Sequence, residues 1–535
     1  MRDAALRSHP FIDLIRQQNK YGGELFMIEI NGEELSIEEV GRVARDYEEV
    51  TLAESAVEDV KKARRQVEDV VDENRICYGI TTVFGRFSDT RISPQEVLKL
   101  QENLIRSHAA GTGESLPREI VRATMLLRIN ALARGHSGIR CETLQLLVDM
   151  LNRGVHPAIP SQGSLGASGD LAPLAHMALV LMGEGRAEID GEEMSGDEAL
   201  ARCSLSPVTP DSKEGLALIN GTQMMTAIAC LALIDARSLL QHADIALALT
   251  MEGLQGILAP FKSAIHEVRP HPGQKRVAAN IYKLLADSSL VLEERDDRVQ
   301  DAYSLRCAPQ VHGASRDAYN HVKETIGREV NSATDNPLLF PDRDEIISGG
   351  NFHGQPLALT LDYLAMALSE LGNISERRVF RMVDGTLNND LPMFLTEHGG
   401  LNSGYMIAQY TSASLVGENK MLTSPASTDS IPTSANQEDH VSMGAISARK
   451  LKRITDNLKN IIAIEFVTAA QAVDMRTEYP EDDLASATGS VFGRIREVVP
   501  RLEEDRVIAD DIAGMRDLIE EEGILQMVKG EVDFS

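Results

Sequence analysis

The segment from Gly163 to Met177, with the sequence GSLGASGDLAPLAHM, joins a glycine-rich turn to the start of an apolar helix. Asp170 stands at the junction and Pro173 lies just inside the apolar run, which is the pattern of a helix N-terminus with an acidic cap. The glycines before the cap give the backbone conformations that other residues avoid. The segment therefore predicts a tight turn at Ala167-Ser168-Gly169, directly before a helix.

A tight turn at this tripeptide has a chemical use. If the amide nitrogen of Gly169 attacks the carbonyl carbon of Ala167, the backbone closes into a five-membered ring, and loss of water from Ser168 leaves an exocyclic methylene. The product, a methylidene-imidazolone, is a strong electrophile. Gly169 suits the attacking position because it has no Cβ, and the positive end of the following helix favours negative charge on the ring. The alternative is an ordinary loop, since Ala, Ser and Gly are common residues.

Other polar side chains in the first half of the chain have types suited to chemistry. Tyr78 lies in a glycine- and threonine-rich loop, residues 76–89, and is either a packing residue or a proton acceptor. Ser107-His108 ends a predicted helix, where a histidine also interacts with the helix dipole. Asn220 and Gln223 lie one turn apart inside an apolar helix, a spacing typical of internally satisfied core amides.

The second half of the chain adds three polar clusters. Gln300, Tyr303 and Arg306 are close in sequence, and the last two can share one face of a helix. An arginine held there either binds a substrate carboxylate in bidentate fashion or caps a neighbouring helix. Phe352 lies in a loop rich in Asn, Gly and Pro, and Gln437-Glu438 belongs to the string SANQEDHVSMG, where a charged side chain is otherwise solvated.

The content and order of these motifs resemble the histidine and aromatic amino acid ammonia-lyases over roughly residues 25–500. The resemblance implies that Ala167-Ser168-Gly169 forms the methylidene-imidazolone (MIO) group and that no metal or soluble cofactor is needed. It implies catalytic roles for Tyr78, Tyr303 and Glu438. It implies a homotetramer whose sites combine several subunits. The residues implied to bind substrate are His108, Asn220, Gln300, Arg306, Phe352 and Gln437.

The reaction that this resemblance implies is removal of ammonia from an α-amino acid. It breaks a weakly acidic β C–H bond and expels a poor leaving group, so it needs an electrophile and a base. Attack on the electrophile by the amine and by the aromatic ring both stay open. An ordinary phenol is a weak base near neutral pH, so Tyr78 needs positive potential from Arg306 or from the helix terminus. Its loop departs from the family pattern, with Thr81 in place of an asparagine and Val83 in place of a glycine.

Two residue pairs resemble the histidine-specific members of the family. Ser107-His108 and Gln437-Glu438 are polar, and an imidazole ring needs polar partners that a phenyl ring would leave unpaired. The resemblance therefore implies L-histidine as the substrate, with trans-urocanate and ammonia as products, in histidine catabolism. A phenylalanine or tyrosine ammonia-lyase, or an aminomutase of the same family, is the alternative.

Composition limits the partners and the compartment. The chain of 535 residues carries a formal net charge of −28, which argues against nucleic acid or an anionic membrane as a partner. Five scattered cysteines without CxxC spacing predict neither disulfides nor a zinc site and fit a reducing compartment. The N-terminus lacks a signal peptide's apolar segment, so the expected location is cytoplasmic. The uncharged run Gly215–Ile234 is interrupted by Asn220 and Gln223, which favours a buried helix over a membrane span.

Long apolar periodicities predict the architecture. Helices of this length pack around one core, so the predicted fold is mainly α, a long-helix bundle of the aspartase/fumarase-like type with a smaller mixed N-terminal domain. The predicted divisions are an N-terminal extension (1–24), an N-terminal domain with the tyrosine and MIO loops (25–210), and the bundle with an acidic helical C-terminal region (211–535). Leu25–Ile37 predicts a small hairpin around an Asn-Gly turn. The clearest apolar stripe consists of Leu357, Leu361, Leu364, Leu368 and Leu371.

Other classes of protein fit the sequence less well. The chain lacks the Ser-x-Met-Pro-x-Lys-x-Asn signature of the fumarase and aspartase group. It contains neither the GxSxG of a serine hydrolase nor a GxGxxG phosphate loop. A non-enzymatic helical scaffold is the remaining alternative, and in a scaffold the tripeptide would stay uncyclised.

Overall fold

The structure is a computed structural model that describes residues 27–82, 94–530 and 532. The chain divides into two compact units, each assembled from three segments. The first unit contains residues 1–231, 324–360 and 425–449, and the second contains residues 232–323, 361–424 and 450–535. The expected extension, residues 1–24, lies outside the described residues, and the linear division predicted from the sequence stays a prediction.

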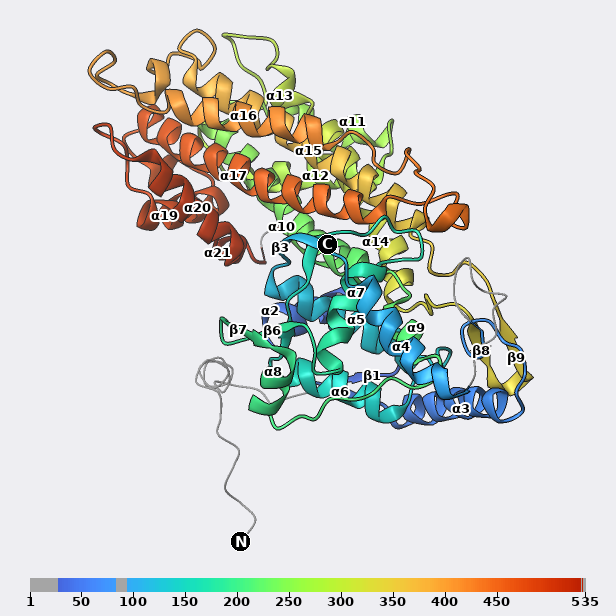
Figure 1. The fold of residues 1–535 in the computed structure, drawn as a ribbon. Helices are drawn as coiled ribbons and strands as arrows, with labels where there is room; N and C mark the ends of the chain where they lie inside the picture. The colour runs from blue at the N-terminus through green and yellow to red at the C-terminus, as the bar shows by residue number, and fades with distance from the viewer. Residues whose placement is uncertain (1–26, 83–93, 531, 533–535) are drawn as a thin grey trace. The chain divides into compact units, whose positions relative to one another are not determined.

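Long helices dominate the fold, as the sequence predicted. The longest are α10 (Gln223–Gly253), α14 (Ala308–Val330), α15 (Gln355–Val383) and α17 (Gly444–Arg476), which Figure 1 shows in green, yellow and orange. All five leucines of the predicted stripe lie on α15 and are fully buried. α10 is long and apolar enough to cross a membrane, but 83% of its apolar window is buried inside the protein, as in a core helix.

A buried polar network joins the four long helices within the second unit. Arg378 on α15 donates to Glu465 on α17 (Nη2 to Oε2, 2.8 Å), and both side chains are fully buried. His312 on α14 contacts Arg378 (3.3 Å) and Asp244 on α10 (2.9 Å). Burial lowers the pKa of His312, so its imidazole is neutral at pH 7. Because each member satisfies another, the network fixes how these helices face one another.

Shorter helices complete the second unit. They include α16 (Met406–Leu422), which contacts α17 through a hydrogen bond between Asn457 and Asn419 (2.8 Å). The others are α11 (Ser263–Glu267), α12 (Pro272–Leu284), α13 (Tyr303–Arg306), α18 (Pro480–Asp483), α19 (Ser486–Val498), α20 (Ile508–Glu520), α21 (Gly523–Met527) and the 3₁₀ turns η2 (Ala259–Phe261) and η4 (Met393–Leu395).

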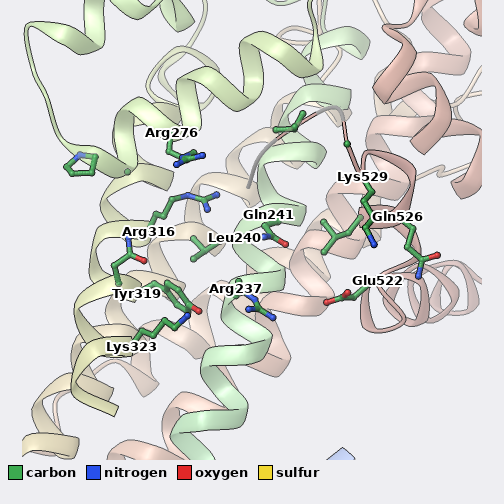
Figure 2. A pocket seen from close by; sticks show the side chains of 16 residues that line it. Arg237, Leu240, Gln241, Arg276, Arg316, Tyr319, Lys323, Glu522, Gln526 and Lys529 are labelled. Carbon is green, nitrogen blue, oxygen red and sulfur yellow. The ribbon is translucent and has the colours of Figure 1, made fainter. Parts of the chain in front are cut away.

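A basic cavity of about 1030 Å³ lies in the second unit. Arg276, Arg316 and Lys323 line one side of it, and Lys529 lines the other beside Glu522 (Figure 2). Most of the residues implicated in chemistry by the sequence line a different cavity, which belongs to the first unit.

The first unit combines helices with short strands. α5 (Arg118–Ala133) is buried from Ile120 to its end. The other helices of the first unit are α2 (Ile37–Arg45), α3 (Glu54–Asp72), α4 (Pro94–His108), α6 (Cys141–Asn152), α7 (Leu171–Leu181), α8 (Gly196–Arg202), α9 (Glu214–Ile219) and the 3₁₀ turns η3 (Pro341–Arg343) and η5 (Ser434–Asn436). Antiparallel pairs join β3 (Thr112–Ser115) to β5 (Pro160–Gln162), β6 (Arg186–Ile189) to β4 (His156–Pro157) and β7 (Glu192–Ser195), and β8 (Leu338–Phe340) to β9 (Glu345–Ile347).

The predicted N-terminal hairpin is wrong. β1 (Ile28–Ile30) pairs in parallel with β2 (Val50–Leu52), and α2 lies between them in sequence. At the Asn-Gly sequence the chain bends through a side-chain turn instead, in which Asn31 Oδ1 accepts hydrogen bonds from the amides of Glu33 and Glu34. The turn leads into α2, whose N-cap is Ser36, so it ends the strand without returning the chain beside it.

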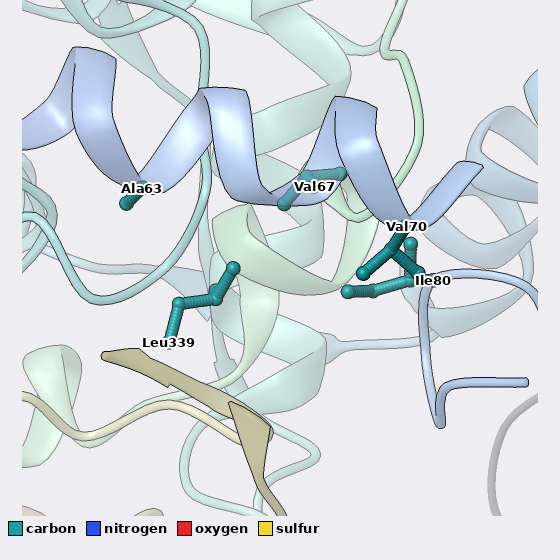
Figure 3. Packing of buried hydrophobic residues seen from close by; sticks show 5 residues of the cluster. All are labelled: Ala63, Val67, Val70, Ile80 and Leu339. Atoms are coloured by element: carbon teal, nitrogen blue, oxygen red, sulfur yellow. The ribbon is translucent and has the colours of Figure 1, made fainter. Parts of the chain in front are cut away.

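A small apolar cluster anchors the loop that carries Tyr78. Val67 and Val70 on α3 pack against Leu339 on β8 and Ile80 in the tyrosine loop (Figure 3). These four side chains are almost fully buried, and Cys77, next to Tyr78, packs against the cluster. Apolar burial on both sides of Tyr78 therefore holds the start of this loop in place.

Leu339→Ala is expected to destabilise the protein by about 2–5 kcal/mol, because it leaves a cavity in this cluster. Denaturant unfolding of the purified protein measures the loss. The matched control is Ile347→Ala on the neighbouring strand β9, whose side chain is 49% exposed and should change stability by only about 0.5 kcal/mol. Equal losses in the two variants would contradict this description of the cluster.

Candidate active site

The Ala167-Ser168-Gly169 turn is formed by a close approach of two backbone segments. Gly169 has φ 68° and forms a parallel bridge with Gly221, and the next amide, of Asp170, donates to the Gly221 oxygen at 2.6 Å. A Cβ on Gly169 would lie 2.1 Å from that oxygen. Glycine is therefore required here both for its φ and for the space.

A second set of contacts holds the turn against residues that are distant in sequence. The backbone oxygen of Gly166 accepts hydrogen bonds from Ser442 Oγ (2.7 Å) and from the amide of Gly354 (3.2 Å). The amide of Met443 donates to the oxygen of Leu165 (2.7 Å). These bonds bring the strings GGNFHGQP and SANQEDHVSMG beside the turn, inside the first unit.

Asp170 occupies the predicted N-cap position of α7, but its side chain serves another helix. Its Oδ2 accepts a hydrogen bond from the amide of Met225 (2.9 Å), in the first turn of α10, and its Oδ1 accepts one from Ser164 Oγ (3.0 Å). The side chain is fully buried, and this burial raises its pKa to about 7. Asp170 therefore links the turn to the start of α10.

A cavity of about 810 Å³ opens beside the turn. The described residues that line it all belong to the first unit, and they come from the tyrosine loop, α4, the turn, the segment after α9, the loop before α15 and the segment around η5. The structure brings these predicted site residues together around it: Tyr78, His108, Ala167, Ser168, Asn220, Phe352, Gln437 and Glu438. Gly169 adjoins them but does not line the cavity.

Ser168 and Glu438 are in direct contact. The Ser168 hydroxyl donates to Glu438 Oε1 at 2.7 Å, and Glu438 Oε2 accepts a hydrogen bond from the hydroxyl of Thr433 at 2.8 Å. Both carboxylate oxygens are thus occupied by hydroxyl donors. This pairing aims the Glu438 carboxylate at the one hydroxyl that cyclisation of the turn would have to eliminate.

His108 presents a defined tautomer at the cavity. Its Nδ1 lies 2.8 Å from the backbone oxygen of Leu104, which only accepts hydrogen bonds, so Nδ1 carries the proton. In the neutral form of this ring, Nε2 would therefore be an acceptor. The tyrosine loop is closed by Thr81, whose hydroxyl donates to the oxygen of Arg75 (2.6 Å) and accepts from the amide of Cys77 (2.9 Å). Val83 lies outside the described residues.

The two neighbouring amides of the predicted site differ. Gln223 is satisfied by Arg128 (2.8 Å) and by Thr334 (2.8 Å), as a core amide should be. The side-chain oxygen of Asn220 is buried and has no hydrogen-bond partner among the described residues. Of the two residues, only Asn220 lines the cavity and has an acceptor left for a bound molecule.

Gln300, Tyr303 and Arg306 do not line this cavity. All three belong to the second unit. The Arg306 guanidinium lies over the Tyr303 ring, 4.5 Å from its centroid, and its Nε donates to the oxygen of Asp301 (2.9 Å). Tyr303 is 70% exposed. Arg306 and Tyr303 are therefore in contact with each other away from the cavity, and Gln300 nearby in sequence is exposed.

Comparison with known proteins decides the family. The profile of the aromatic amino acid lyases matches residues 35–497. The chain belongs to the aromatic amino acid lyase family. It is 54% identical over 495 residues to the histidine ammonia-lyase of Natranaerobius thermophilus. The aligned region covers 92% of this chain and 97% of that protein. Membership of the family confirms the predicted enzyme class, a carbon–nitrogen lyase.

Solved structures confirm the fold of this aromatic amino acid lyase. The histidine ammonia-lyase of Trypanosoma cruzi matches with a TM-score of 0.88 at 41% identity, covering 95% of this chain and 96% of that chain. The tyrosine aminomutase of Streptomyces globisporus matches with a TM-score of 0.90 at 38% identity, covering 95% and 99%. The long-helix fold is thus shared by lyases and aminomutases.

Sequence reasoning missed several lining residues of the aromatic amino acid lyase cavity. His353 and His440 stack with ring centroids 5.7 Å apart, and His353 Nε2 lies 3.2 Å from the His440 oxygen. Both histidines lie within loops that the sequence analysis had selected, so a histidine in such a loop was the feature that could have predicted them. Lys213 and Asp335 are not among the residues that line the cavity, and only the folded structure shows that they contact Asn220 or its partners.

Asp170→Asn should change how stability depends on pH. The raised pKa of Asp170 means that the folded state holds a proton which the unfolded state releases near pH 3.8. The stability from this proton is complete below pH 3.8 and is lost as the pH rises through about 7. Asp170→Asn removes this dependence, so its stability relative to wild type should rise between these pH values by up to about 4 kcal/mol and then level off.

Denaturant unfolding of both proteins at several pH values between 4 and 8.5 measures this difference. Asp59→Asn, at an exposed position on α3, is the matched control and should follow wild type at every pH. A difference between Asp170→Asn and wild type that does not vary with pH would contradict the assignment.

Proposed function

We propose that this protein eliminates ammonia from L-histidine and releases trans-urocanate, in histidine catabolism in the cytoplasm. The observation that carries the proposal is the contact between Ser168, in the tight Ala-Ser-Gly turn, and Glu438, within a cavity that Tyr78 and His108 also line. The high identity to named histidine ammonia-lyases over nearly the whole chain supports the same substrate.

The turn fits the MIO group. Gly169 has no Cβ to obstruct its amide, and its backbone is already folded back against Gly221. Asn220, in the lining of the same cavity, has a side-chain oxygen to which no described residue donates a hydrogen bond. Formed from Ala167-Ser168-Gly169, the group would supply an electrophile for the substrate, with no metal or soluble cofactor. Glu438, in contact with the Ser168 hydroxyl, would donate a proton to that hydroxyl so that it leaves as water, while the Cα proton of Ser168 is lost.

The other side chains of the cavity bind and deprotonate the substrate in this proposal. Tyr78 takes the β proton. His108 Nε2 accepts a hydrogen bond from the imidazole N–H, and Gln437 and Glu438 offer further polar contacts to that ring. Phe352 packs against the substrate. A phenyl ring would leave these polar groups unpaired, and this discriminates against phenylalanine.

The remaining substrate contacts come from a second copy of the chain in a homotetramer. Tyr303 is 70% exposed, and with Gln300 and Arg306 it lies outside the unit that forms the cavity. Arg306 would bind the substrate carboxylate, and Tyr303 would assist catalysis. Exposed apolar side chains on α15 and α16 support association between copies, among them Tyr363, Met366, Ile407, Tyr410 and Met421.

Ser168→Ala should abolish turnover, lowering kcat by at least about 10³-fold, because the electrophile cannot form. The assay follows ultraviolet product formation from L-histidine, L-phenylalanine and L-tyrosine in parallel, without added cofactor.

Tyr78→Phe should keep the electrophile yet lose about 10²–10⁴-fold in kcat in the same assay. Urocanate as the only product of the wild-type enzyme would support the proposal. Cinnamate or coumarate as the main product would favour a phenylalanine or tyrosine lyase, and an active Ser168→Ala enzyme would defeat it.

Sites shared between subunits predict complementation. Ser168→Ala and Arg306→Ala should each be inactive as pure proteins, but co-expressed chains should regain activity, since mixed tetramers contain sites with both native residues. Ser168→Ala with Tyr78→Phe is the control: both positions line the cavity of one chain, so this pair should regain none. Activity from the first pair no greater than that of its separate members would refute sharing.

A further inference from the structure

The side-chain amide of Asn220 is held in one orientation. Its Nδ2 donates to Asp335 Oδ1 (3.1 Å) and to the backbone oxygen of Asn336 (3.2 Å). An amide nitrogen has two hydrogens, and both are used. The oxygen of the amide, which is without a hydrogen-bond partner among the described residues, therefore cannot exchange places with the nitrogen without losing both bonds.

Asp335 is held in turn by a buried lysine. Lys213 Nζ lies 2.7 Å from Asp335 Oδ2, and the two side chains are 0% and 2% exposed. Asp335 Oδ1 also accepts the amide of Asn336 at 2.7 Å. Both carboxylate oxygens are thus engaged, so rotation of the Asp335 side chain would break the ion pair and the bond to Asn220 together.

The short helix α9 explains why one segment supplies both partners of Asp335. Lys213 is its N-cap and Asn220 its C-cap. The Lys213 backbone has φ 71°, a left-handed conformation that is costly for a residue with a side chain. At the other end, Arg128 Nη1 donates to the backbone oxygen of Asn220 (3.0 Å). Both ends of α9 are therefore fixed, and the strain at Lys213 is retained where its ammonium reaches Asp335.

We propose that Lys213 and Asp335 are positioning residues that fix Asn220 so that its Oδ1 accepts a hydrogen bond from the ammonium group of the bound amino acid. This inference rests on the function proposed above. An ammonium group only donates hydrogen bonds, so a flipped amide would oppose N–H to N–H. Burying the Asp335 carboxylate without a counter-charge would cost more free energy than burying it as an ion pair with Lys213. The lysine therefore allows the aspartate to be buried next to Asn220.

Two neutral double variants separate positioning from charge. Lys213→Met/Asp335→Asn keeps an oxygen that can accept from Asn220 and should retain most of the wild-type kcat/KM for L-histidine. Lys213→Met/Asp335→Leu lacks that oxygen and should lose about 10²-fold, mainly through a higher KM, because Asn220 is free to turn. Neither variant leaves a lone buried charge, and the thermal midpoint of each reports whether it folds.

A cycle with Asn220→Ala identifies the route of the effect. If the pair acts through Asn220, adding Asn220→Ala to the Leu-containing double variant should cost no further kcat/KM. Lys459→Met, which breaks a buried ion pair with Asp235 in the second unit, is the control for destabilisation and should leave KM unchanged.

Three results would overturn the inference. They are equal kcat/KM in the two double variants, an additive loss on adding Asn220→Ala, and an unchanged KM in Asn220→Ala itself. Each of these requires an active wild type, so they are distinct from a failure of the proposed function. A wild-type enzyme that converts none of the three amino acids would reject that function and this inference with it.

Discussion

The contact between the backbones of Gly169 and Gly221 is the constraint on which the site depends. No side chain fits between the two segments, and the amide of Asp170 holds them together by donating to the Gly221 oxygen at 2.6 Å. It places Ser168 beside the end of α9 and the start of α10, so a loop and two helix ends meet at one point. The cavity forms around that junction.

Buried polar groups then hold the junction together. The Asp170 carboxylate accepts a hydrogen bond from the amide of Met225 in the first turn of α10. The ion pair of Lys213 with Asp335, and the bond from Asn220 to Asp335, fix the two ends of α9. Each arrangement costs desolvation and gains a specific geometry. Helix ends suit this use because their unpaired amides and carbonyls must find partners in any case. The same groups therefore stabilise the fold and orient the side chains of the cavity.

The sequence predicted local features and single motifs well. The leucine stripe on α15 was predictable because burial imposes a helical period, and the glycines of the Ala-Ser-Gly turn because a tight turn restricts residue type. The predicted hairpin failed because β1 finds its partner beyond α2, and a turn motif does not specify its strand partner. Likewise, the sequence marks Asp170 as an N-cap but does not show that its side chain caps α10.

The composition of the cavity was predictable only through family resemblance. Tyr78, Ser168 and Glu438 lie far apart in sequence, and no period or spacing connects them. The pairing of Lys213 with Asp335 was not predictable because a buried ion pair has no signature in a sequence, and its role follows from the atoms that the two residues touch. Gln300, Tyr303 and Arg306 show the converse, since a motif alone does not say whether its residues line the cavity.

The most direct measurement is the mass of the peptide that contains Ala167, Ser168 and Gly169, taken from the purified protein. The account predicts a mass lower than the sequence mass by two water molecules, one lost on ring closure and one from Ser168, and an unmodified mass for this peptide in Ser168→Ala. A wild-type peptide at its full sequence mass would contradict the account, because the turn would then be an ordinary loop.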